Sequence, residues 1–266
     1  MQNFYILFLY FFIYSVIGWS LEMVYCRILN GKWNNRGFLF GPYCPIYGFG
    51  AIVIIYTLIY FIDSPVKVFF LGMLFASILE YITSFLLEKI FKAKWWDYST
   101  YPFNFNGRIC LLNSLEFGIL GLVLTYISHP FISDIILKLP SDNIQFISFI
   151  LVALLSVDSC STIISLSNLK QKLSILYDLA EKLKNDLKPS HKLSDFAIYK
   201  EFDEVRKKFI RKRDIQIERL LAAFPSLQFK EFSKQMDEFK HDLNKFREDL
   251  KNKKKDKEVK KLSEKN

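Results

Sequence analysis

The sequence predicts an all-α polytopic membrane protein, a bundle of five transmembrane helices followed by a cytoplasmic helical or coiled-coil tail. The 266 residues are 51% hydrophobic and 17% aromatic, with 27 Phe, which is more apolar surface than one soluble core can bury. Charge is divided sharply: residues 1–166 carry 9 Lys and Arg against 9 Asp and Glu, whereas residues 167–266 carry 27 against 18. The net charge of +9 therefore lies entirely in the tail.

Five stretches have the length and composition of membrane-spanning helices. A crossing needs roughly 20 mostly apolar residues, and the stretches that qualify lie at about 4–25, 44–62, 66–88, 109–128 and 144–166. The first begins in an uncharged segment that runs to Leu21 and lacks the basic region and the small-residue cleavage site of a secretory signal. We therefore expect it to be retained as the first helix of a bundle over residues 1–166.

The loops between these stretches indicate an orientation. Lys and Arg are favoured in short cytoplasmic loops. They number three in residues 26–43 and four in residues 89–108, but one each in residues 63–67 and 129–143. Together with the basic tail, this alternation predicts a cell-membrane protein with its amino terminus outside and its carboxyl terminus in the cytoplasm.

The tail has the pattern of helices that need a partner surface. Apolar residues recur in heptad steps over 166–187 and again over 229–250. One interpretation is a helical hairpin or coiled coil over 167–250, through which the chain can self-associate. The other is an amphipathic region that lies on the membrane. Residues 251–266 are mostly charged and are expected to be disordered.

The basic residues of the tail favour lipid over nucleic acid. The run RKKFIRKR at 206–213 can lie against anionic lipid headgroups. No nucleic-acid-binding motif accompanies this run, so we expect no nucleic-acid partner.

The sequence contains no recognisable catalytic or cofactor motif. Its four cysteines are scattered and form no CxxC or Cys/His cluster, so we expect neither a metal nor any other cofactor. It has no nucleophile elbow and no HExxH. Its one Gly-Lys pair, Gly31-Lys32, is followed by Trp33 and lacks the spacing of a phosphate-binding loop. We therefore expect neither an enzyme nor a built-in ATPase.

Several carboxylates lie within the predicted spans. A charged side chain at the centre of a membrane helix costs roughly 2.5–3.5 kcal/mol on insertion scales, so such residues are usually paired or functional. Arg36 and Arg108 enter at a similar depth, where each can pair with a glutamate or hold an anionic ligand. Two interpretations stay open: a substrate pocket that opens to the cytoplasm, or ion pairs that only fix helix packing. The carboxylates, all in the cytoplasmic half of the bilayer under the orientation above, are Glu22, Glu80, Glu88, Glu116 and Asp158.

The start of the second predicted span cannot be a regular helix. Proline removes backbone hydrogen-bond donors, and backbone freed inside a membrane must find partners in protein or water. Broken helices of this kind build substrate sites in transporters, but the same pattern also fits a plain connecting loop. The residues concerned are Gly41, Pro42, Pro45 and Gly48.

Three long motifs resemble a known family. They are NNRGFLFGPYCPIYGFG at 34–50, LEYITSFLLEKIFKAKWWDYS at 79–99 and PFNFNGRICL at 102–111, preceded by Gly18-Trp19 and Glu22. In this order they closely resemble the putative ABC-transporter type IV family, also called CmpB-like membrane proteins. The resemblance covers roughly residues 4–165 and leaves out the tail. It implies a bacterial multi-pass protein that forms the permease half of an ATP-driven transporter.

The expected function is therefore a permease-like transport component that needs a separate ATPase subunit on its inner loops or tail. One alternative is a membrane sensor or scaffold that dimerises through a coiled-coil tail. A weaker alternative is an intramembrane enzyme that combines Asp97 with the carboxylates of the spans. The residues do not indicate a substrate.

Overall fold

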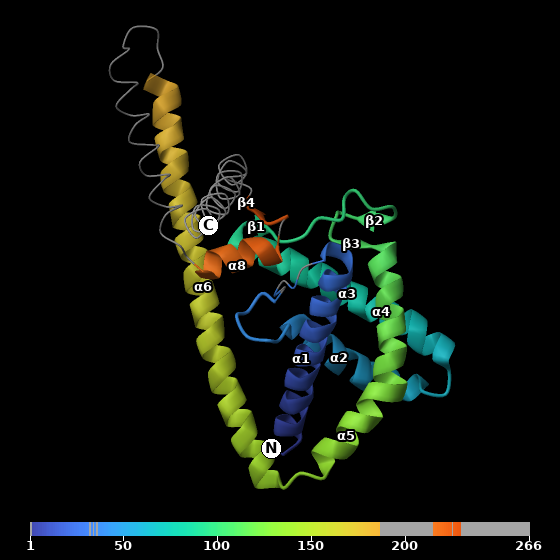
Figure 1. Cartoon of the computed structure of the whole chain (residues 1–266). Helices are drawn as coiled ribbons and strands as arrows, with labels where there is room; N and C mark the ends of the chain where they lie inside the picture. Colours follow the sequence, from blue (N-terminus) through green and yellow to red (C-terminus); the bar gives the residue numbers. More distant parts are fainter. Residues whose placement is uncertain are drawn as a thin grey trace, which may run out of the picture. The chain divides into compact units, whose positions relative to one another are not determined.

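The computed structural model describes residues 2–31, 33, 35, 37–186, 215–224 and 226–229. Helices dominate the described chain (Figure 1). They are α1 (Gln2–Asn30), α2 (Pro45–Leu58), the 3-10 helix η1 (Ile59–Phe61), α3 (Pro65–Phe91), α4 (Leu111–Val123), the π-helix η2 (Leu124–Ser128), α5 (His129–Leu137), α6 (Ser141–Asp186) and α8 (Ile215–Ala223). The strands are two residues each: β1 (Ala93–Lys94), β2 (Asn104–Phe105), β3 (Ile109–Cys110) and β4 (Gln228–Phe229).

The chain divides into two compact units. One contains Met1–Ser165 with Gln216–Leu227, and the other contains Leu166–Ile215 with Gln228–Asn266. The first unit holds the helix bundle, the β2–β3 hairpin and α8. In the hairpin, Asn104 pairs with Cys110 and Phe105 with Ile109 in antiparallel register.

Within the described residues, four helices are long and apolar enough to cross a membrane: Phe4–Ile28, Pro65–Phe91, Leu111–Leu137 and Ser141–Gln171. They correspond to the first, third, fourth and fifth predicted spans. The second predicted span is not confirmed as a full crossing, because its apolar helix extends only over Pro45–Phe61. At 1.5 Å per residue this run is about 26 Å long, shorter than the hydrocarbon core of about 30 Å. The residues before it form an irregular loop instead of the missing helical turn.

Proline and the backbone conformations of loop residues set the ends of these helices. Pro45 and Pro65 occupy the first turns of α2 and α3, where a missing N–H removes no helical hydrogen bond. The α3 helix ends at Phe91 and is capped by Lys92, whose φ of 56° is left-handed. The span Leu111–Leu137 is interrupted by the π-helix η2, just before Pro130 begins α5. A π-helical turn is a recognised cause of bending in a helix.

Glycines let neighbouring helices approach closely. A Cβ at Gly48 of α2 would lie 2.3 Å from Ser15 Oγ and 2.4 Å from the Phe11 carbonyl oxygen of α1. On the next pair of helices, a Cβ at Gly72 of α3 would lie 3.6 Å from the Gly121 Cα of α4. Small residues at such crossings are typical of membrane helix packing, because apolar side chains gain little by leaving lipid.

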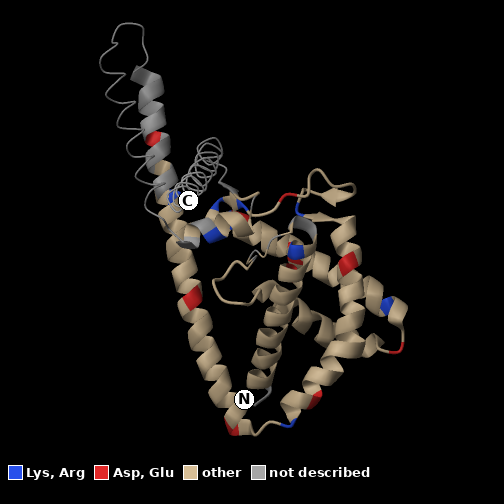
Figure 2. Ribbon diagram, viewed as in Figure 1, with Lys and Arg blue, Asp and Glu red and all other residues tan. Residues whose placement is uncertain are grey.

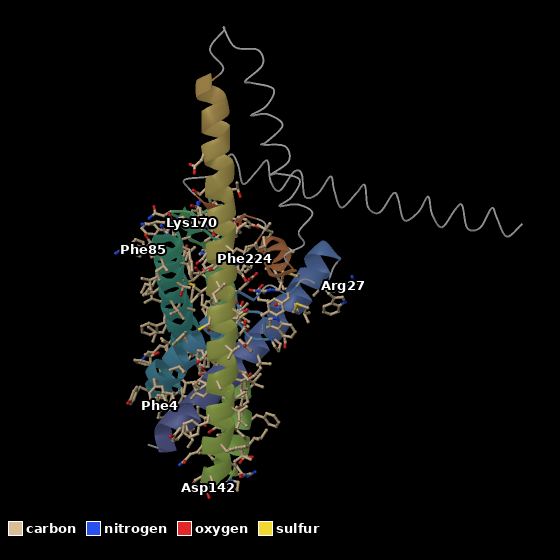
Figure 3. The ribbon with its side chains drawn as sticks, turned by 90° about the vertical axis from the view of Figure 1, so that its left-hand side faces the viewer. Phe4, Arg27, Phe85, Asp142, Lys170 and Phe224 are labelled. Atoms are coloured by element: carbon tan, nitrogen blue, oxygen red, sulfur yellow. The ribbon has the colours of Figure 1, made fainter. Side chains whose placement is uncertain are left out.

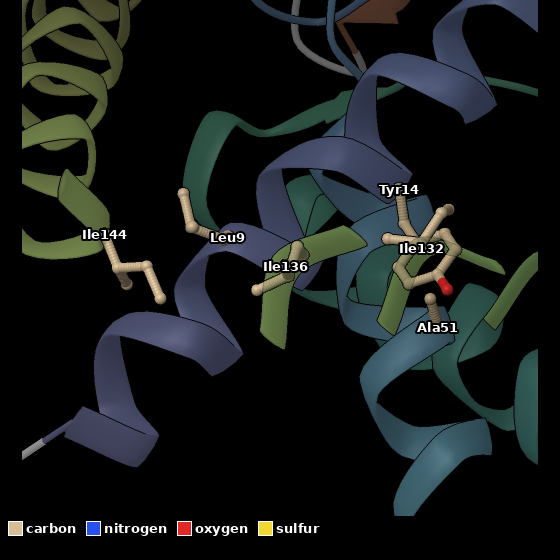
Figure 4. Packing of buried hydrophobic residues seen from close by; sticks show 6 residues of the cluster. All are labelled: Leu9, Tyr14, Ala51, Ile132, Ile136 and Ile144. Atoms are coloured by element: carbon tan, nitrogen blue, oxygen red, sulfur yellow. The ribbon is translucent and has the colours of Figure 1, made fainter. Parts of the chain in front are cut away.

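The labelled residues of Figure 3 mark the two ends of the helix bundle. Figure 3 shows Phe4 and Asp142 toward one end of the helices and Arg27, Phe85 and Phe224 toward the other. A buried apolar cluster from α1, α2, α5 and α6 lies on the side of Phe4 and Asp142 and is shown in Figure 4. Its members are Leu9, Tyr14, Ala51, Ile132, Ile136 and Ile144.

The predicted tail is only partly within the described residues. The α6 helix continues without a break through the fifth predicted span to Asp186. The later parts of the predicted hairpin or coiled coil, residues 187–214 and 230–250, lie outside the described residues, as does the charged segment 251–266. Residues 216–227, which lie within the predicted tail of 167–250, belong to the same compact unit as the helix bundle.

Candidate functional site

Polar side chains interrupt the apolar helices at a few positions. Figure 2 shows long uncharged stretches of ribbon, with acidic residues part-way along α4 and α6. In the sequence these two helices carry Glu116 and Asp158. The hydrogen-bond partners of each carboxylate determine whether it is available to bind a ligand.

Asp158 of α6 binds the irregular loop at residues 37–44. Its Oδ1 accepts the backbone N–H of Phe40 at 2.8 Å, and its Oδ2 accepts the N–H of Gly41 at 2.7 Å. The Tyr43 hydroxyl donates to Oδ2 at 2.6 Å. Thr162, one turn along α6, donates to Oδ1 at 3.4 Å. The carboxylate therefore accepts two backbone N–H groups of the loop and links the loop to α6.

The predicted broken-helix residues shape this loop and its continuation. A Cβ at Gly41 would lie 2.4 Å from the Tyr43 ring, so glycine permits the fold that brings both residues to Asp158. Pro42 is exposed at the bend and Pro45 begins α2. The loop is also fixed to α1, because the Cys44 N–H donates to the Ser15 carbonyl at 2.8 Å. These contacts make it a specific structure with partners on two helices.

Arg219 of α8 holds the opposite side of the same loop. Its guanidinium donates to the carbonyls of Gly37 and Leu39 at 2.8 Å each and to the Phe38 carbonyl at 3.2 Å. It also lies over the Phe40 ring, 4.9 Å from the centroid. Burial lowers the pKa of Arg219 from its ordinary value, against the opposing influence of the Asp158 charge. An arginine far along the chain thus completes the loop's hydrogen bonds.

Trp95 provides the apolar part of the α8 contact. It is 2% exposed and packs against Phe38 of the loop, Phe91 of α3 and Phe224 at the end of α8, with ring centroids 5.0, 5.8 and 5.0 Å away. The Ser226 hydroxyl donates to the Trp95 carbonyl at 3.1 Å. One tryptophan therefore joins the loop, α3 and α8.

Arg108 forms an ion pair with Glu88. Arg108 Nη2 lies 2.7 Å from Glu88 Oε2, and the two side chains are only 15% and 13% exposed. Arg108 also donates to Ser84 Oγ at 3.3 Å, and its guanidinium lies 5.6 Å from the ring centroids of both Tyr81 and Phe85. These contacts tie the β2–β3 hairpin to α3. They agree with the interpretation in which Glu88 and Arg108 form an ion pair that fixes helix packing.

A second group of polar residues, which we call the polar cluster, consists of Glu22, Tyr47, Glu80, Tyr98 and Asn113. Glu22 of α1 accepts the Tyr47 hydroxyl of α2 at 2.7 Å, and Glu80 Oε1 of α3 accepts the Tyr98 hydroxyl at 3.3 Å. Asn113 of α4 lies close to both Glu80 and Tyr98. Burial raises the pKa of the Tyr98 phenol, and the nearby carboxylates of Glu80 and Glu22 raise it further. The cluster therefore joins four helices and the segment between α3 and α4.

Glu80 is the most buried carboxylate of the cluster. It is 6% exposed, and its Oε2 has no hydrogen-bond partner of good geometry among the described residues, although the Asn113 side chain lies close enough to interact with the carboxyl group. The Ser77 hydroxyl, one turn away on α3, donates to Ser114 of α4 at 2.8 Å. Polar contacts thus continue along the α3–α4 contact beside Glu80.

Other predicted site residues do not join the polar cluster. Glu116 is exposed on α4, and Arg36 lies outside the described residues. Asp97, the residue of the enzyme alternative, lies 2.9 Å from Lys94. Partial burial favours a higher pKa for Asp97, but hydrogen bonds from Lys94 and Ser99 outweigh it and lower the pKa. In the part of the chain that the structure describes, no group of three His, Cys, Asp or Glu residues can hold a metal ion.

Three contributors were missed by reasoning from the sequence: Tyr47, Tyr98 and Arg219. Tyr47 and Tyr98 lie inside the motifs at 34–50 and 79–99, and this position within a family motif was the sequence feature that could have identified them. Arg219 stands among the apolar residues of α8, and a single arginine in such a segment carries little information by itself.

Comparison with known proteins identifies one family. The sequence pattern of the family described as putative ABC-transporter type IV matches residues 9–163. This range contains every residue of the polar cluster and Asp158, and it excludes α8. No curated protein and no solved structure matches the chain.

Removing one member of the Glu88–Arg108 pair should destabilise the fold. Arg108→Gln deprives Glu88 of this cation in a poorly hydrated position, and should lower the free energy of unfolding by about 3–5 kcal/mol. The double variant Glu88→Arg, Arg108→Glu should recover part of the loss. The measurement is the melting temperature of the detergent-purified full chain, with the exposed neighbour Lys89→Gln as an unaffected control. An Arg108→Gln protein of normal stability would contradict the packing role.

Shortening Arg219 should loosen α8. Arg219→Gln removes charge-assisted hydrogen bonds that are worth about 1.5–3 kcal/mol in total when partly buried. Amide hydrogen exchange over residues 215–223 should then accelerate at least about tenfold in the full chain. Ala222→Ser, at an exposed position of the same helix, is the matched control and should leave exchange unchanged. Equal exchange in the wild type and Arg219→Gln would show that the aromatic contacts alone hold α8.

Proposed function

Because this chain belongs to the putative ABC-transporter type IV family, we propose that it is the permease-like membrane subunit of an ATP-driven transporter and binds a separate ATPase subunit. The family and the four apolar helices support a multi-pass membrane protein with a transporter-like function. The observation that carries the transport role is the polar cluster around buried Glu80.

A buried carboxylate within a membrane-spanning helix lowers the stability of the protein unless it is paired or neutralised, so such residues usually have a function. Glu80 lies within the span Pro65–Phe91 and is almost completely buried. Residues of this kind in membrane proteins usually mark substrate or ion pathways, or are neutralised by a cation. Among the described residues, no ion pair involves Glu80, whereas Arg108 pairs with Glu88. The polar cluster is therefore the best-supported place for a substrate or a coupling ion.

The 37–44 loop offers a route by which a cytoplasmic partner can act on the cluster. Arg219 holds the carbonyls at 37–39, and Asp158 holds the N–H groups of the next two residues. The chain then enters α2, which carries Tyr47 to Glu22. An ATPase that displaces α8 or the loop would shift the start of α2, and with it one hydrogen bond of the cluster.

The orientation that fits this role has the amino terminus outside and the carboxyl terminus in the cytoplasm. The alternation of basic loops supports it. In this arrangement the 37–44 loop enters the membrane from the cytoplasmic side and completes the crossing for which α2 alone is too short. Irregular backbone at that depth is tolerated when protein satisfies it, as Asp158 and Arg219 do here.

A sensor or scaffold that dimerises through its tail is the second candidate function. The observation that favours it is the length of α6, which runs for 46 residues from the last span into the heptad region. Helices that leave the membrane without a break are suited to transmit a change at one end to the other. In the purification described below, a dimer without any bound ATPase would favour this candidate.

Cysteine labelling tests the orientation. In a Cys160→Ser background, which removes the exposed native thiol, cysteines at Asp63 and Asp142 should react with an impermeant reagent applied to intact cells. Cysteines at Trp96 and Asp178 should react only after permeabilisation, because these positions face the cytoplasm in the proposal. External labelling at Trp96 would show the opposite orientation. The segment between α3 and α4 would then lie outside the cell, where a cytoplasmic ATPase could not bind it.

Purification from native membranes tests the partner. The tagged full chain, extracted in mild detergent, should bring down a protein with a phosphate-binding loop in near-stoichiometric amount. When the two are reconstituted in liposomes, the chain should change the rate of ATP hydrolysis by that protein. Another multi-pass protein tagged in the same cells is the control for nonspecific recovery. Failure to recover an ATPase, or an ATPase whose rate ignores the chain, would reject the permease role.

A further inference from the structure

We propose that the segment between α3 and α4, which carries the β2–β3 hairpin (Figure 1), enters the lipid interface of the bilayer beside α3. The side chains that meet lipid are Tyr101, Phe103 and Phe105, which we call the aromatic tip. The partner of this surface is the layer where lipid headgroups meet the acyl chains. The inference goes beyond transport, because it holds for either orientation of the chain and for any role of the polar cluster.

The aromatic tip is exposed and lies in an uncharged stretch of sequence. The three side chains are 43%, 82% and 60% exposed for Tyr101, Phe103 and Phe105. Residues 98–107 contain no Lys, Arg, Asp or Glu. Exposed apolar surface of this kind marks a site of interaction with a membrane or with another protein. Aromatic side chains are typical of the membrane interface, where an apolar ring can leave water while the backbone near it stays hydrated.

The hairpin lies beside a part of α3 that the bilayer covers. The Phe105 ring centroid is 5.6 Å from that of Tyr81, and Asn106 Nδ2 donates to the Tyr81 hydroxyl at 3.1 Å. Tyr81 belongs to the candidate span Pro65–Phe91, ten residues before its end. At 1.5 Å per residue the span is about 40 Å long, and Tyr81 lies about 15 Å inside it. A bilayer with its headgroup regions is about 40–45 Å thick, so Phe105 lies at bilayer depth.

The backbone around the tip is largely satisfied from within the segment. The Asn104 amide donates to the carbonyls of Tyr101 at 2.8 Å and Ser99 at 3.2 Å, and its oxygen accepts the Gly107 N–H at 3.1 Å. The Tyr98 N–H donates to the Gly107 carbonyl at 2.9 Å. Irregular backbone can approach lipid only where protein or interfacial water satisfies its polar groups. These hydrogen bonds therefore make the segment suited to the interface.

Phe103 has an unfavourable backbone conformation together with the most exposed ring of the tip. Its φ of 53° lies in the left-handed region, which bulky residues rarely adopt. Conformations of this kind are often found at functional sites. The ring gains nothing from protein contacts at 82% exposure. Transfer of the ring from water into the lipid interface supplies a reason for a phenylalanine at this position.

Lipid fits this surface better than a protein partner because the tip continues the lipid-facing side of α3. Ile82 and Phe85 are exposed within the candidate span Pro65–Phe91, where lipid is the expected neighbour. The Arg108 guanidinium, which follows the tip in the chain, lies over the Phe85 ring at 5.6 Å. The exposed rings of the tip and the exposed side chains of α3 therefore belong to one region, next to the bilayer.

Depth-dependent fluorescence quenching tests the position of the tip. The full chain in a Cys160→Ser background, whose other cysteines are buried, carries a fluorophore on Phe103→Cys and is reconstituted into phosphatidylcholine vesicles. A nitroxide near the top of the acyl chain should quench this probe at least about twofold more than one near the chain end, because interfacial groups lie about 5–10 Å deep.

Two control positions calibrate the measurement. A probe on Ile78→Cys, exposed midway along the α3 span, should be quenched more by the deep nitroxide. A probe on Asp178→Cys, exposed beyond the last span, should be quenched by neither. If Phe103→Cys does not fold, Tyr101→Cys takes its place with the same expected order. A tip probe that behaves like the one on Asp178→Cys, or like the one on Ile78→Cys, would overturn the inference.

A charge at the tip tests whether the Phe103 ring holds it in the interface. With the probe on Tyr101→Cys, the additional change Phe103→Asp should reduce quenching by the shallow nitroxide at least about twofold, because a carboxylate is disfavoured near hydrocarbon. Thr100→Ser, at an exposed position of the same segment, is the matched control and should leave quenching unchanged. Equal quenching in Phe103→Asp and its parent would contradict an anchoring role for the ring.

Crosslinking in native membranes separates lipid from a protein partner. A photoreactive phenylalanine analogue in place of Phe103 should yield lipid adducts on illumination. A protein adduct on most of the chain would overturn the assignment to lipid. Recovery of an ATPase with the tagged chain changes none of these results, so failure of the permease role and failure of this inference are distinguishable.

Discussion

Backbone hydrogen bonding in the 37–44 loop is the constraint on which the rest of this structure depends. A loop between apolar helices exposes N–H and C=O groups that lipid cannot satisfy. Here the two kinds of group are satisfied by residues of opposite charge: Asp158 accepts the N–H groups of Phe40 and Gly41, and Arg219 donates to three preceding carbonyls. The two residues lie far apart in the chain, so folding of the loop requires α6 and α8 to be in place.

The fixed loop determines where α2 begins and thereby how the polar cluster forms. Because regular helix starts only at Pro45, the apolar segment Pro45–Phe61 is shorter than the four candidate spans, and Gly48 lets α2 pack directly against α1. That close crossing brings Tyr47 to Glu22. A Cβ at Gly18 would lie 2.2 Å from the Tyr47 ring, so α1 is also shaped to receive this side chain.

The carboxylates of the spans differ in what surrounds them. Asp158 and Glu88 have donors or a cation from elsewhere in the bundle, and such contacts account for their presence as structural links. Glu80 lies instead beside the Tyr98 hydroxyl and the Asn113 side chain, and one of its oxygens has no hydrogen-bond partner of good geometry among the described residues. A partly satisfied buried network is costly, so packing alone explains Glu80 less well than it explains Asp158 and Glu88.

The sequence by itself determined the properties that depend on composition and local pattern: apolar helices of spanning length, carboxylates kept within them, a proline-broken segment, and the motifs of one family. It could not determine that the apolar helix of the second predicted span covers only Pro45–Phe61, because Asp158 and Arg219 hold the preceding residues in a loop. Nor could it separate Glu80 from Glu88, since both occupy the same polar face of one helix. Only tertiary structure brings Arg108 to Glu88 and Tyr98 to Glu80, because hydrogen bonds between distant segments have no local sequence signal.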